Sequence, residues 1–296
     1  MADEFITIGS GDLSAGINPL GAELWSLKDG QGRELMTDAD PRWWTGHAPL
    51  LFPFVGRSRG DAYRFEGRDY PMPQHGFARR RLFDVVERSD EAATFRLEAD
   101  AETRAVYPFD FRLDMRFAVE RAALRMTATV ANRGTGDLPF SFGYHPAFAW
   151  PLPYGGAAED HRVLFEKAEP APIRKVGDEP GLIALESAPS PVEGHVLAPT
   201  PATFRGDALI WDRLESRSLF WGVPGGRGLR IDFPDTPWLG LWQKPGAHYL
   251  CVEPWAGMAD LVGFAGDVWE KQGIMRLAPG EERAFRMDVA VVDGWI

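Results

Sequence analysis

The pattern of hydrophobic and polar positions has a period of two where it is most regular. Polar or small side chains alternate with apolar ones at Phe111, Leu113, Met115, Phe117 and Val119. A second alternating run extends from Leu124 to Val130. Because successive side chains of a strand point to opposite faces of a sheet, we predict that the two runs form an antiparallel hairpin with one face toward water.

Short strand-like runs, separated by glycine and proline, make up most of the remaining chain. Residues 5–36 have the turn-rich pattern of a β-meander, and residues 63–70 form a predicted hairpin that turns at Glu66-Gly67. Residues 285–291 alternate again near the end of the chain. These runs are too short and too often interrupted for helices of ordinary length, so strands are the expected element.

Helical patterns are confined to residues 101–106 and to the neighbourhood of Trp269. Residues 151–203 are rich in Pro, Gly and Ala, and we expect long loops over short strands there. With about twenty short strands, the sequence predicts an all-β protein, a large antiparallel β-sandwich with few short helices. No repeat or shift in composition divides it, so residues 1–296 are expected to form a single domain.

Composition and charge narrow the functional classes. The chain of 296 residues is 45% hydrophobic, which is enough to bury a large core and excludes a disordered protein. Its formal net charge of -11 argues against a nucleic acid or an anionic membrane as partner, because those surfaces attract lysine and arginine across a whole face. An anionic ligand must therefore meet a local cluster of arginines.

The cellular location is predicted from what the sequence lacks. Cys251 is the single cysteine, which excludes an internal disulfide. The first residues have neither the basic nor the apolar region of a signal peptide, and no apolar run approaches the ~20 residues that cross a bilayer. We therefore expect a cytoplasmic protein without membrane insertion.

Three titratable side chains stand next to proline or glycine in apolar surroundings. His75 precedes Gly76, His145 precedes Pro146, and Glu253 follows the apolar run Tyr-Leu-Cys-Val and precedes Pro254 at an expected strand end. A partly desolvated position would raise the pKa of the Glu253 carboxyl. Either histidine alone is more often structural than catalytic, but three such residues in matching contexts indicate a shared pocket.

Arginines form a local basic patch in this acidic chain. Arg57 and Arg59 follow a proline-punctuated apolar run, and a second group stands at Arg79, Arg80 and Arg81. Guanidinium groups suit sugar hydroxyls or, through paired contacts, a phosphate. For Arg80 and Arg81 we favour a solvent-facing position without a ligand.

Two aspartates flank the strand-like residues 208–211. Asp207 and Asp212 should point in opposite directions from one strand, so at most one of them faces a ligand.

Several cofactor motifs are absent. The sequence contains no dinucleotide-binding glycine pattern, no phosphate-cradling Gly-Lys-Ser/Thr loop, no paired cysteines at zinc spacing and no Gly-x-Ser-x-Gly elbow, so an enzyme without a cofactor fits best. Two alternatives remain open from the residues. One is a carbohydrate-binding protein without turnover; the other uses His75, His145 and Glu253 as a metal site, which elemental composition would decide.

Four collinear segments resemble a known family. Residues 48–57, 73–79, 143–148 and 251–255 read Ala-Pro-Leu-Leu-Phe-Pro-Phe-Val-Gly-Arg, Pro-Gln-His-Gly-Phe-Ala-Arg, Gly-Tyr-His-Pro-Ala-Phe and Cys-Val-Glu-Pro-Trp. Together they resemble the aldose 1-epimerase (galactose mutarotase-like) family, in its bacterial branch that is also similar to hexose-6-phosphate mutarotases. The resemblance extends over nearly the whole chain.

The resemblance implies a galactose mutarotase-like supersandwich that interconverts the α and β anomers of a sugar. It places Glu253 as general base, His145 as general acid and His75 as an assistant at the ring oxygen. No metal or redox cofactor is implied, and the partner is a small-molecule sugar or sugar phosphate.

The resemblance also implies substrate contacts. Arg57 matches a substrate-binding arginine, and Asp207 matches a hydroxyl-binding aspartate, with Asp212 still possible. Gln74 and Trp255 join them as expected substrate contacts, with aromatic rings such as Trp255, Trp242 and Phe77 suited to stacking on the pyranose. The Gln-His-Gly-Phe-Ala-Arg form, with Arg79, is similar to the phosphosugar branch and favours an anionic hexose phosphate.

Overall fold

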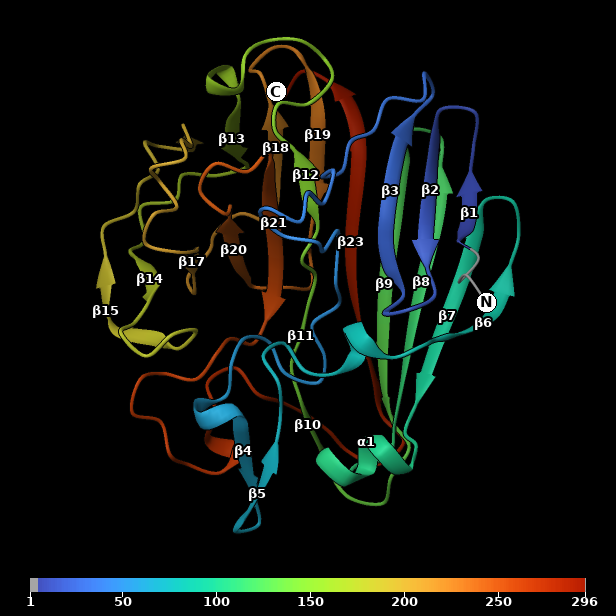
Figure 1. Ribbon diagram of the computed structural model, residues 1–296, viewed down its shortest axis with the longest axis vertical. Helices are drawn as coiled ribbons and strands as arrows, with labels where there is room; N and C mark the ends of the chain where they lie inside the picture. The colour runs from blue at the N-terminus through green and yellow to red at the C-terminus, as the bar shows by residue number, and fades with distance from the viewer. Residues whose placement is uncertain (1–4, 296) are drawn as a thin grey trace.

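Antiparallel β-sheets build almost the whole molecule (Figure 1). The computed structural model describes residues 5–295. Its largest sheet has nine strands, which are, in spatial order, β16 (Val196–Leu197), β13 (Arg162–Phe165), β18 (Ser218–Gly222), β19 (Arg227–Asp232), β23 (Glu282–Asp293), β9 (Ala123–Asn132), β8 (Phe111–Glu120), β7 (Ala92–Glu98) and β6 (Asp84–Arg88). Within this sheet every strand is antiparallel to its neighbours.

Two smaller sheets form the opposite layer of the sandwich. The seven-stranded one contains, in spatial order, β11 (Phe142–Gly143), β21 (Tyr249–Ala256), β20 (Trp238–Trp242), β17 (Leu209–Trp211), β14 (Ile173–Val176) and β15 (Ile183–Ala188), with β12 (Ala147–Ala149) also paired to β21. The three-stranded one contains β1 (Ile6–Gly9), β2 (Leu13–Asn18) and β3 (Glu23–Asp29). Figure 1 shows these three strands in front of β7, β8 and β9, which β1 and β2 contact.

The remaining elements are short. Two further strand pairs are β4 (Ala62–Phe65) with β5 (Arg68–Pro71), and β10 (Leu138–Phe140) with β22 (Met275–Leu277). The α-helix α1 (Ala101–Val106) begins at Asp100, whose side chain accepts a hydrogen bond from the Thr103 backbone N–H. Four single-turn 3₁₀ helices cover Arg59–Asp61, Ala78–Arg80, Ala158–Asp160 and Val268–Glu270. The predicted antiparallel β-sandwich with few helices is therefore confirmed.

The long hairpin of β8 and β9 matches its predicted pattern. Phe111 pairs with Asn132 at one end and Glu120 pairs with Ala123 at the other, in unbroken register. The alternating apolar side chains, from Phe111 to Val119, are buried, and the residues between them are partly or fully exposed. The period of two in the sequence thus corresponds to one face on the core and one toward water.

Aromatic side chains join the two layers. Phe142 of β11 lies against Phe285 of β23 with ring centroids 5.2 Å apart, and Phe165 of β13 lies 5.6 Å from Trp211 of β17. The buried Tyr144 hydroxyl accepts a hydrogen bond from Ala128 N and lies 2.8 Å from the Phe285 carbonyl oxygen. This hydroxyl ties the segment that carries His145 to the nine-stranded sheet.

One finding concerns membranes. Among residues 5–295, no helix is long and apolar enough to span a bilayer.

Candidate functional site

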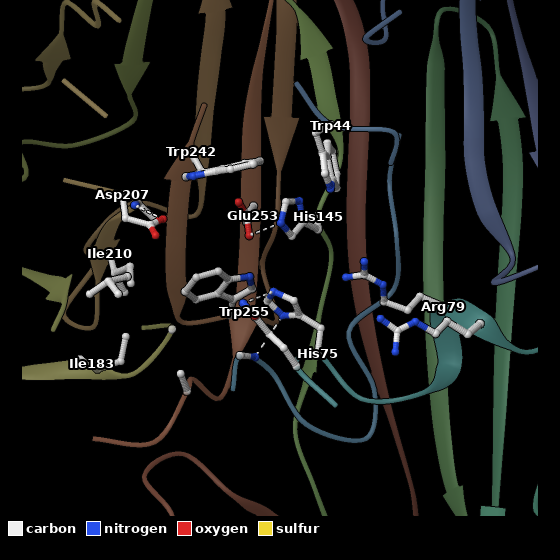
Figure 2. Close-up of a pocket in the computed structure, with 17 residues that line it drawn as sticks. Trp44, His75, Arg79, His145, Ile183, Asp207, Ile210, Trp242, Glu253 and Trp255 are labelled. Atoms are coloured by element: carbon white, nitrogen blue, oxygen red, sulfur yellow. Dashed lines mark hydrogen bonds and ion pairs between the residues drawn. The ribbon is translucent and has the colours of Figure 1, made fainter. Parts of the chain in front are cut away.

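A cavity of about 310 Å³ is lined by residues from strands across the seven-stranded sheet. Its lining comes from segments that are far apart in the chain: the loop of Trp44, the segment 74–80, His145, the β14–β15 region, Asp207 and strands β20 and β21 (Figure 2). The three candidate acid–base residues, Glu253, His145 and His75, all line it. The structure therefore brings together the three side chains that their matching sequence contexts had grouped.

Glu253 and His145 form a buried contact at the floor of this cavity. The His145 Nε2 atom lies 3.2 Å from Glu253 Oε2, and the two residues are 7% and 2% exposed. Burial raises the pKa of the Glu253 carboxyl well above its usual value, and the nearby charge of Asp207 raises it further. Burial lowers the pKa of His145 to about 3. Both shifts favour a pair without net charge that holds one proton between two groups.

Strand pairing explains why these two side chains meet. Strand β21, which is buried along its whole length, pairs with β11 at one end and with β12 at the other. His145 lies in the gap between those two strands, where Tyr144 N donates to the Pro254 carbonyl and Val252 N donates to the Pro146 carbonyl. These bonds hold His145 beside Glu253.

The same gap corrects the expectation that Glu253 ends a strand. Pro254 is inside β21, which continues to Ala256. The proline is tolerated because the neighbouring strand is interrupted at this point, so the ladder is not continuous on that side.

His75 is held by the backbone in a strained conformation. Its φ of 67° is left-handed, and the following Gly76 also has a positive φ. A Cβ atom at Gly76 would lie 2.2 Å from the Phe52 carbonyl oxygen, so a glycine is required there. His75 N donates to the Gly56 carbonyl at 2.7 Å, and Gly56 N donates to His75 Nδ1 at 3.1 Å.

This last hydrogen bond selects a tautomer. Since Nδ1 accepts a hydrogen bond from Gly56, the neutral ring carries its hydrogen on Nε2. Burial and the nearby charges of His145 and Arg79 lower the pKa of His75 well below its usual value, which keeps the ring neutral. The Gln74 side-chain amide lies 3.3 Å from Nε2 through its nitrogen, and accepts from Nε2–H when the amide is turned to present its oxygen. His75 is therefore placed as a neutral hydrogen-bond donor in the cavity.

Three tryptophans shape the cavity. The Trp44 ring lies 5.0 Å from that of His145, and Trp242 meets the same imidazole edge-on at 6.1 Å. Trp255 packs where Gly143 and Gly240 leave room, since a Cβ atom at either glycine would lie within 2.7 Å of the indole. The aromatic side chains exclude water around the buried pair and present apolar surface to a ligand.

The predicted arginines have different surroundings. Arg79 lines the cavity half-buried, and its guanidinium has no hydrogen bond or ion pair to any of residues 5–295. Burial and the neighbouring Arg80 lower the pKa of Arg79, while Glu23 opposes the shift. Arg80 is exposed, in the solvent-facing position that we favoured, although it also reaches the lining of the cavity.

Arg57 and Arg81 do not line the cavity. Arg57 forms a two-point ion pair with Asp61 and donates to the Pro180 carbonyl, so its part as a substrate contact stays a prediction. Arg81 pairs with Asp100 and Glu102, which agrees with a role apart from the cavity.

The two aspartates differ in their surroundings. Asp207 lines the cavity on the side away from Arg79 (Figure 2). Asp212 instead forms an ion pair with Arg174 at 2.8 Å. The strand between them, β17, points the two carboxylates in different directions as alternation requires.

Other predicted contacts differ in position. Gln74, Trp242 and Trp255 line the cavity, whereas Phe77 is buried in the core and meets Phe52 edge-on at 6.2 Å. Phe77 is therefore not a candidate for sugar stacking. Trp44 was not anticipated as a site residue, since it lies in a loop whose position depends on packing with distant segments.

A buried ion pair beneath the cavity joins three of its walls. The Lys271 ammonium pairs with the Asp260 carboxylate, and both side chains are nearly inaccessible. The Asp260 carboxylate also accepts a hydrogen bond from the Arg59 backbone N–H. The backbone of Asp260 makes two more hydrogen bonds: its carbonyl accepts from Ile183 N, and its N–H donates to the Arg57 carbonyl. Next to it, Ala259 is packed against Gly56, which orients His75. Asp260 therefore positions the segments of Gly56 and Ile183.

A group able to hold a metal also occurs here. Among residues 5–295, the ligand atoms of His145, Cys251 and Glu253 lie within 4.8 Å of one another, and all three residues are buried. His75 is not part of the group. The metal-site alternative, which paired His75 with His145 and Glu253, thus differs from the cluster that the fold assembles.

Comparisons with known proteins show which chains this one resembles. A family model described as aldose 1-epimerase matches residues 4–181. The chain is 31% identical over 290 residues to the chromosomal protein LacX of Lactococcus lactis subsp. lactis, covering 95% of this chain and 97% of that protein.

Solved structures are also similar. A galactose mutarotase related enzyme from Lactobacillus acidophilus has 29% identity and a TM-score of 0.89 over 98% of each chain. A galactose mutarotase-like protein from Lactobacillus casei has 31% identity and a TM-score of 0.88, over 98% of this chain and 100% of that one.

The buried ion pair makes a prediction about stability. Replacing Lys271 by methionine leaves the Asp260 carboxylate buried without its counter-ion, and should lower the free energy of unfolding by about 3–5 kcal/mol. The double variant Lys271→Met with Asp260→Asn removes the unpaired charge and should recover most of that loss. Urea denaturation measures both. The exposed pair of Arg64 and Asp69 is the control, since Arg64→Met should have little effect.

If the double variant is no more stable than Lys271→Met alone, the pair does not act through its buried charge.

The raised pKa of Glu253 makes a second prediction. Because the folded-state pKa lies above that of the unfolded chain, folding favours the protonated carboxyl; this contribution is complete at low pH and is lost as pH rises through the folded value. Glutamine resembles the protonated form. Glu253→Gln should therefore match the wild type in stability near about pH 4 and exceed it near about pH 8.

Chemical denaturation at both pH values measures this difference. Glu186→Gln, at an exposed position on β15, is the matched control. A Glu253→Gln protein that loses stability as pH rises, relative to wild type, would show that the carboxylate is ionised and stabilised by its surroundings.

Proposed function

Because this chain belongs to the aldose 1-epimerase family, we propose that it interconverts the α and β anomers of a hexose by opening and reclosing the pyranose ring. The observation that carries the proposal is the 3.2 Å contact of a buried imidazole with a buried carboxyl at the floor of an aromatic-lined cavity. Ring opening removes a proton from the anomeric hydroxyl and adds one to the ring oxygen, and both oxygens are bonded to C1. A carboxyl and an imidazole that share one proton can carry out both transfers.

The steps balance without any additional reactant. When the shared proton lies on His145 and Glu253 is the carboxylate, Glu253 takes the proton of the anomeric hydroxyl while His145 gives its proton to the ring oxygen, and the bond between C1 and that oxygen breaks. The open-chain aldehyde turns about its C1–C2 bond. The hydroxyl formed from the ring oxygen then attacks the other face of the aldehyde. In this step Glu253 returns its proton to the aldehyde oxygen, and the attacking hydroxyl gives its proton back to His145. Acid and base catalysis by positioned groups contributes roughly 10²–10⁴-fold.

His75 is proposed to assist at the ring oxygen. The hydrogen bond from Gly56 to its Nδ1 leaves Nε2–H as a donor, and its ring lies 5.7 Å from the ring of His145. A neutral donor stabilises charge that develops on the ring oxygen without adding a second positive charge beside His145.

The other walls would hold the sugar. Asp207 is proposed to accept hydrogen bonds from ring hydroxyls, and Gln74 to contact the sugar beside His75. The indole of Trp255 offers a surface for the apolar face of the pyranose. We retain Arg57 as a proposed contact as well, although it must exchange its pairing with Asp61 to reach a ligand.

A 6-phosphorylated hexose is the substrate that we propose. The half-buried guanidinium of Arg79 lacks an ion-pair partner in residues 5–295 although it lines the cavity, and Arg80 adds a second positive charge beside it. A cation in such a position is stabilised by an anionic ligand. Glu23 acts on Arg79 without forming an ion pair with it, and the phosphate would supply that direct partner.

Sugar geometry supports the same substrate. The carbon that bears the C6 group is bonded directly to the ring oxygen, so a 6-phosphate extends from the side of the ring that His75 and His145 are proposed to serve. Arg79 lies on that side, and Asp207 lies opposite, where the C2 and C3 hydroxyls would be (Figure 2). One orientation of the sugar thus satisfies all four residues.

Anomer-exchange measurements test the activity. Catalytic amounts of the protein should accelerate exchange between α and β forms of glucose, galactose or their 6-phosphates in NMR exchange spectra, and Glu253→Gln should remove at least about 10²-fold of the rate, because glutamine cannot take the proton. Glu186→Gln is the control. Binding of a sugar without exchange would indicate a carbohydrate-binding protein, and equal rates for wild type and Glu253→Gln on every hexose would contradict the proposed mechanism.

The role of Arg79 is tested by comparing two substrates. Arg79→Ala should lower kcat/KM for glucose 6-phosphate by roughly tenfold to a hundredfold, the worth of a charge-assisted contact, and affect free glucose much less. Arg64→Ala, on β4 away from the cavity, is the control. Equal losses on both substrates would mean that Arg79 does not recognise the phosphate.

A further inference from the structure

We propose that His145, Cys251 and Glu253 form a binding site for a divalent, thiol-preferring cation such as Zn²⁺. The three ligand atoms lie within 4.8 Å of one another, and all three residues are buried. Cys251 and Glu253 are two positions apart on β21 and so point to the same face, and His145 lies beside them in the gap between β11 and β12. The site thus comes from the same strand pairing that joins His145 to Glu253.

The ligand set indicates the kind of ion. Sulfur, imidazole nitrogen and carboxylate oxygen together are typical of zinc, whereas calcium and magnesium take oxygen ligands. Three protein ligands leave a fourth tetrahedral position, and His145 and Glu253 both line the cavity through which water could fill it.

Small side-chain movements suffice to close the site. Zinc bonds of about 2.0–2.3 Å place tetrahedral ligands some 3.5 Å apart, so the 4.8 Å limit leaves little more than 1 Å to close. The His145 Nδ1 atom is buried and has no hydrogen-bond partner among residues 5–295, so no hydrogen bond at that atom has to break when the ring shifts toward a metal.

Charge balance favours a divalent ion. A thiolate and a carboxylate carry two negative charges, and a neutral imidazole adds none, so the site with one divalent ion is neutral and its burial is not penalised by a net charge. The thiol proton and the proton shared by His145 and Glu253 leave to solvent when the metal binds. Around the cysteine, Trp43, Trp44 and Trp242 pack against its cluster and exclude competing water.

Occupation of this site removes the proposed acid–base pair. A metal bound to His145 Nε2 and Glu253 prevents either group from exchanging protons with a sugar, so the cation should inhibit anomer exchange. Inhibition rests on the proposed function, but binding of the metal does not, and the two are measured separately.

Cobalt substitution tests the site directly. The protein is first freed of metal with a chelator and then titrated with Co²⁺. One equivalent of Co²⁺ should bind and give a near-ultraviolet thiolate-to-cobalt band together with the visible bands of tetrahedral cobalt. Zn²⁺ should displace the bound Co²⁺ and remove these bands. Cys251→Ala should abolish the near-ultraviolet band and weaken Zn²⁺ binding by at least about tenfold, since it removes the softest ligand. Cys251→Ser should give the same result, because serine is close in size to cysteine but lacks the sulfur ligand. It replaces the alanine variant if alanine destabilises the fold.

Two further measurements complete the test. His195→Ala and His248→Ala remove exposed histidines and should leave the cobalt spectrum unchanged. Zn²⁺ should inhibit the wild type, with recovery on adding chelator, but not Cys251→Ala, which should keep its activity in the absence of metal. The site is disproved if wild type shows no thiolate band at saturating Co²⁺, or if His145→Ala and Glu253→Gln bind Co²⁺ as tightly as wild type. A thiolate band without inhibition would leave the metal site standing and count against the proposed roles of His145 and Glu253.

Discussion

The contact between Glu253 and His145 is the interaction on which the rest of the site depends. A carboxyl group buried in a strand without water must either remain protonated or be given a partner, and His145 is that partner at 3.2 Å. Placing an imidazole there requires the neighbouring strand to break between β11 and β12. The interruption of the sheet and the pairing of the two titratable groups are therefore one structural feature.

The surrounding segments hold this pair in a dry environment and add a second donor. Trp44, Trp242 and Trp255 surround the imidazole and carboxyl, and two glycines on β11 and β20 make room for the last of these. His75 is fixed by hydrogen bonds with Gly56, and Gly56 in turn packs on the residue next to Asp260. Buried titratable groups thus occur in two places, in the pair of His145 and Glu253 that lines the cavity and in the ion pair of Lys271 and Asp260.

The same desolvation has several consequences. Burial raises the pKa of Glu253 and lowers the pKa of His145. It also surrounds the Arg79 cation, which has no ion-pair partner in residues 5–295. Each of these lowers the stability of the folded protein. Groups held in this way are ready for a substrate that supplies the missing charge and hydrogen bonds. They are also open to a metal ion, because Cys251 adds a sulfur ligand behind the pair.

The sequence alone was sufficient for the sandwich and for the residue types of the site. Strict alternation from Phe111 to Val119 specifies a strand with one buried face, and this local pattern needs no knowledge of distant segments. The proline and glycine that follow His145 and His75 also mark irregular backbone locally. Both signals are short-range, and short-range signals are what a single sequence contains.

Only the tertiary structure decided which of the candidates meet. It placed Asp207 in the cavity and Asp212 on Arg174, kept Arg57 with Asp61 and put Phe77 in the core. It also brought Trp44 and Cys251 to His145, which no local pattern indicates. These outcomes depend on contacts between residues up to about two hundred positions apart. Such contacts follow from the order and register of the strands, and the alternation within one strand specifies neither.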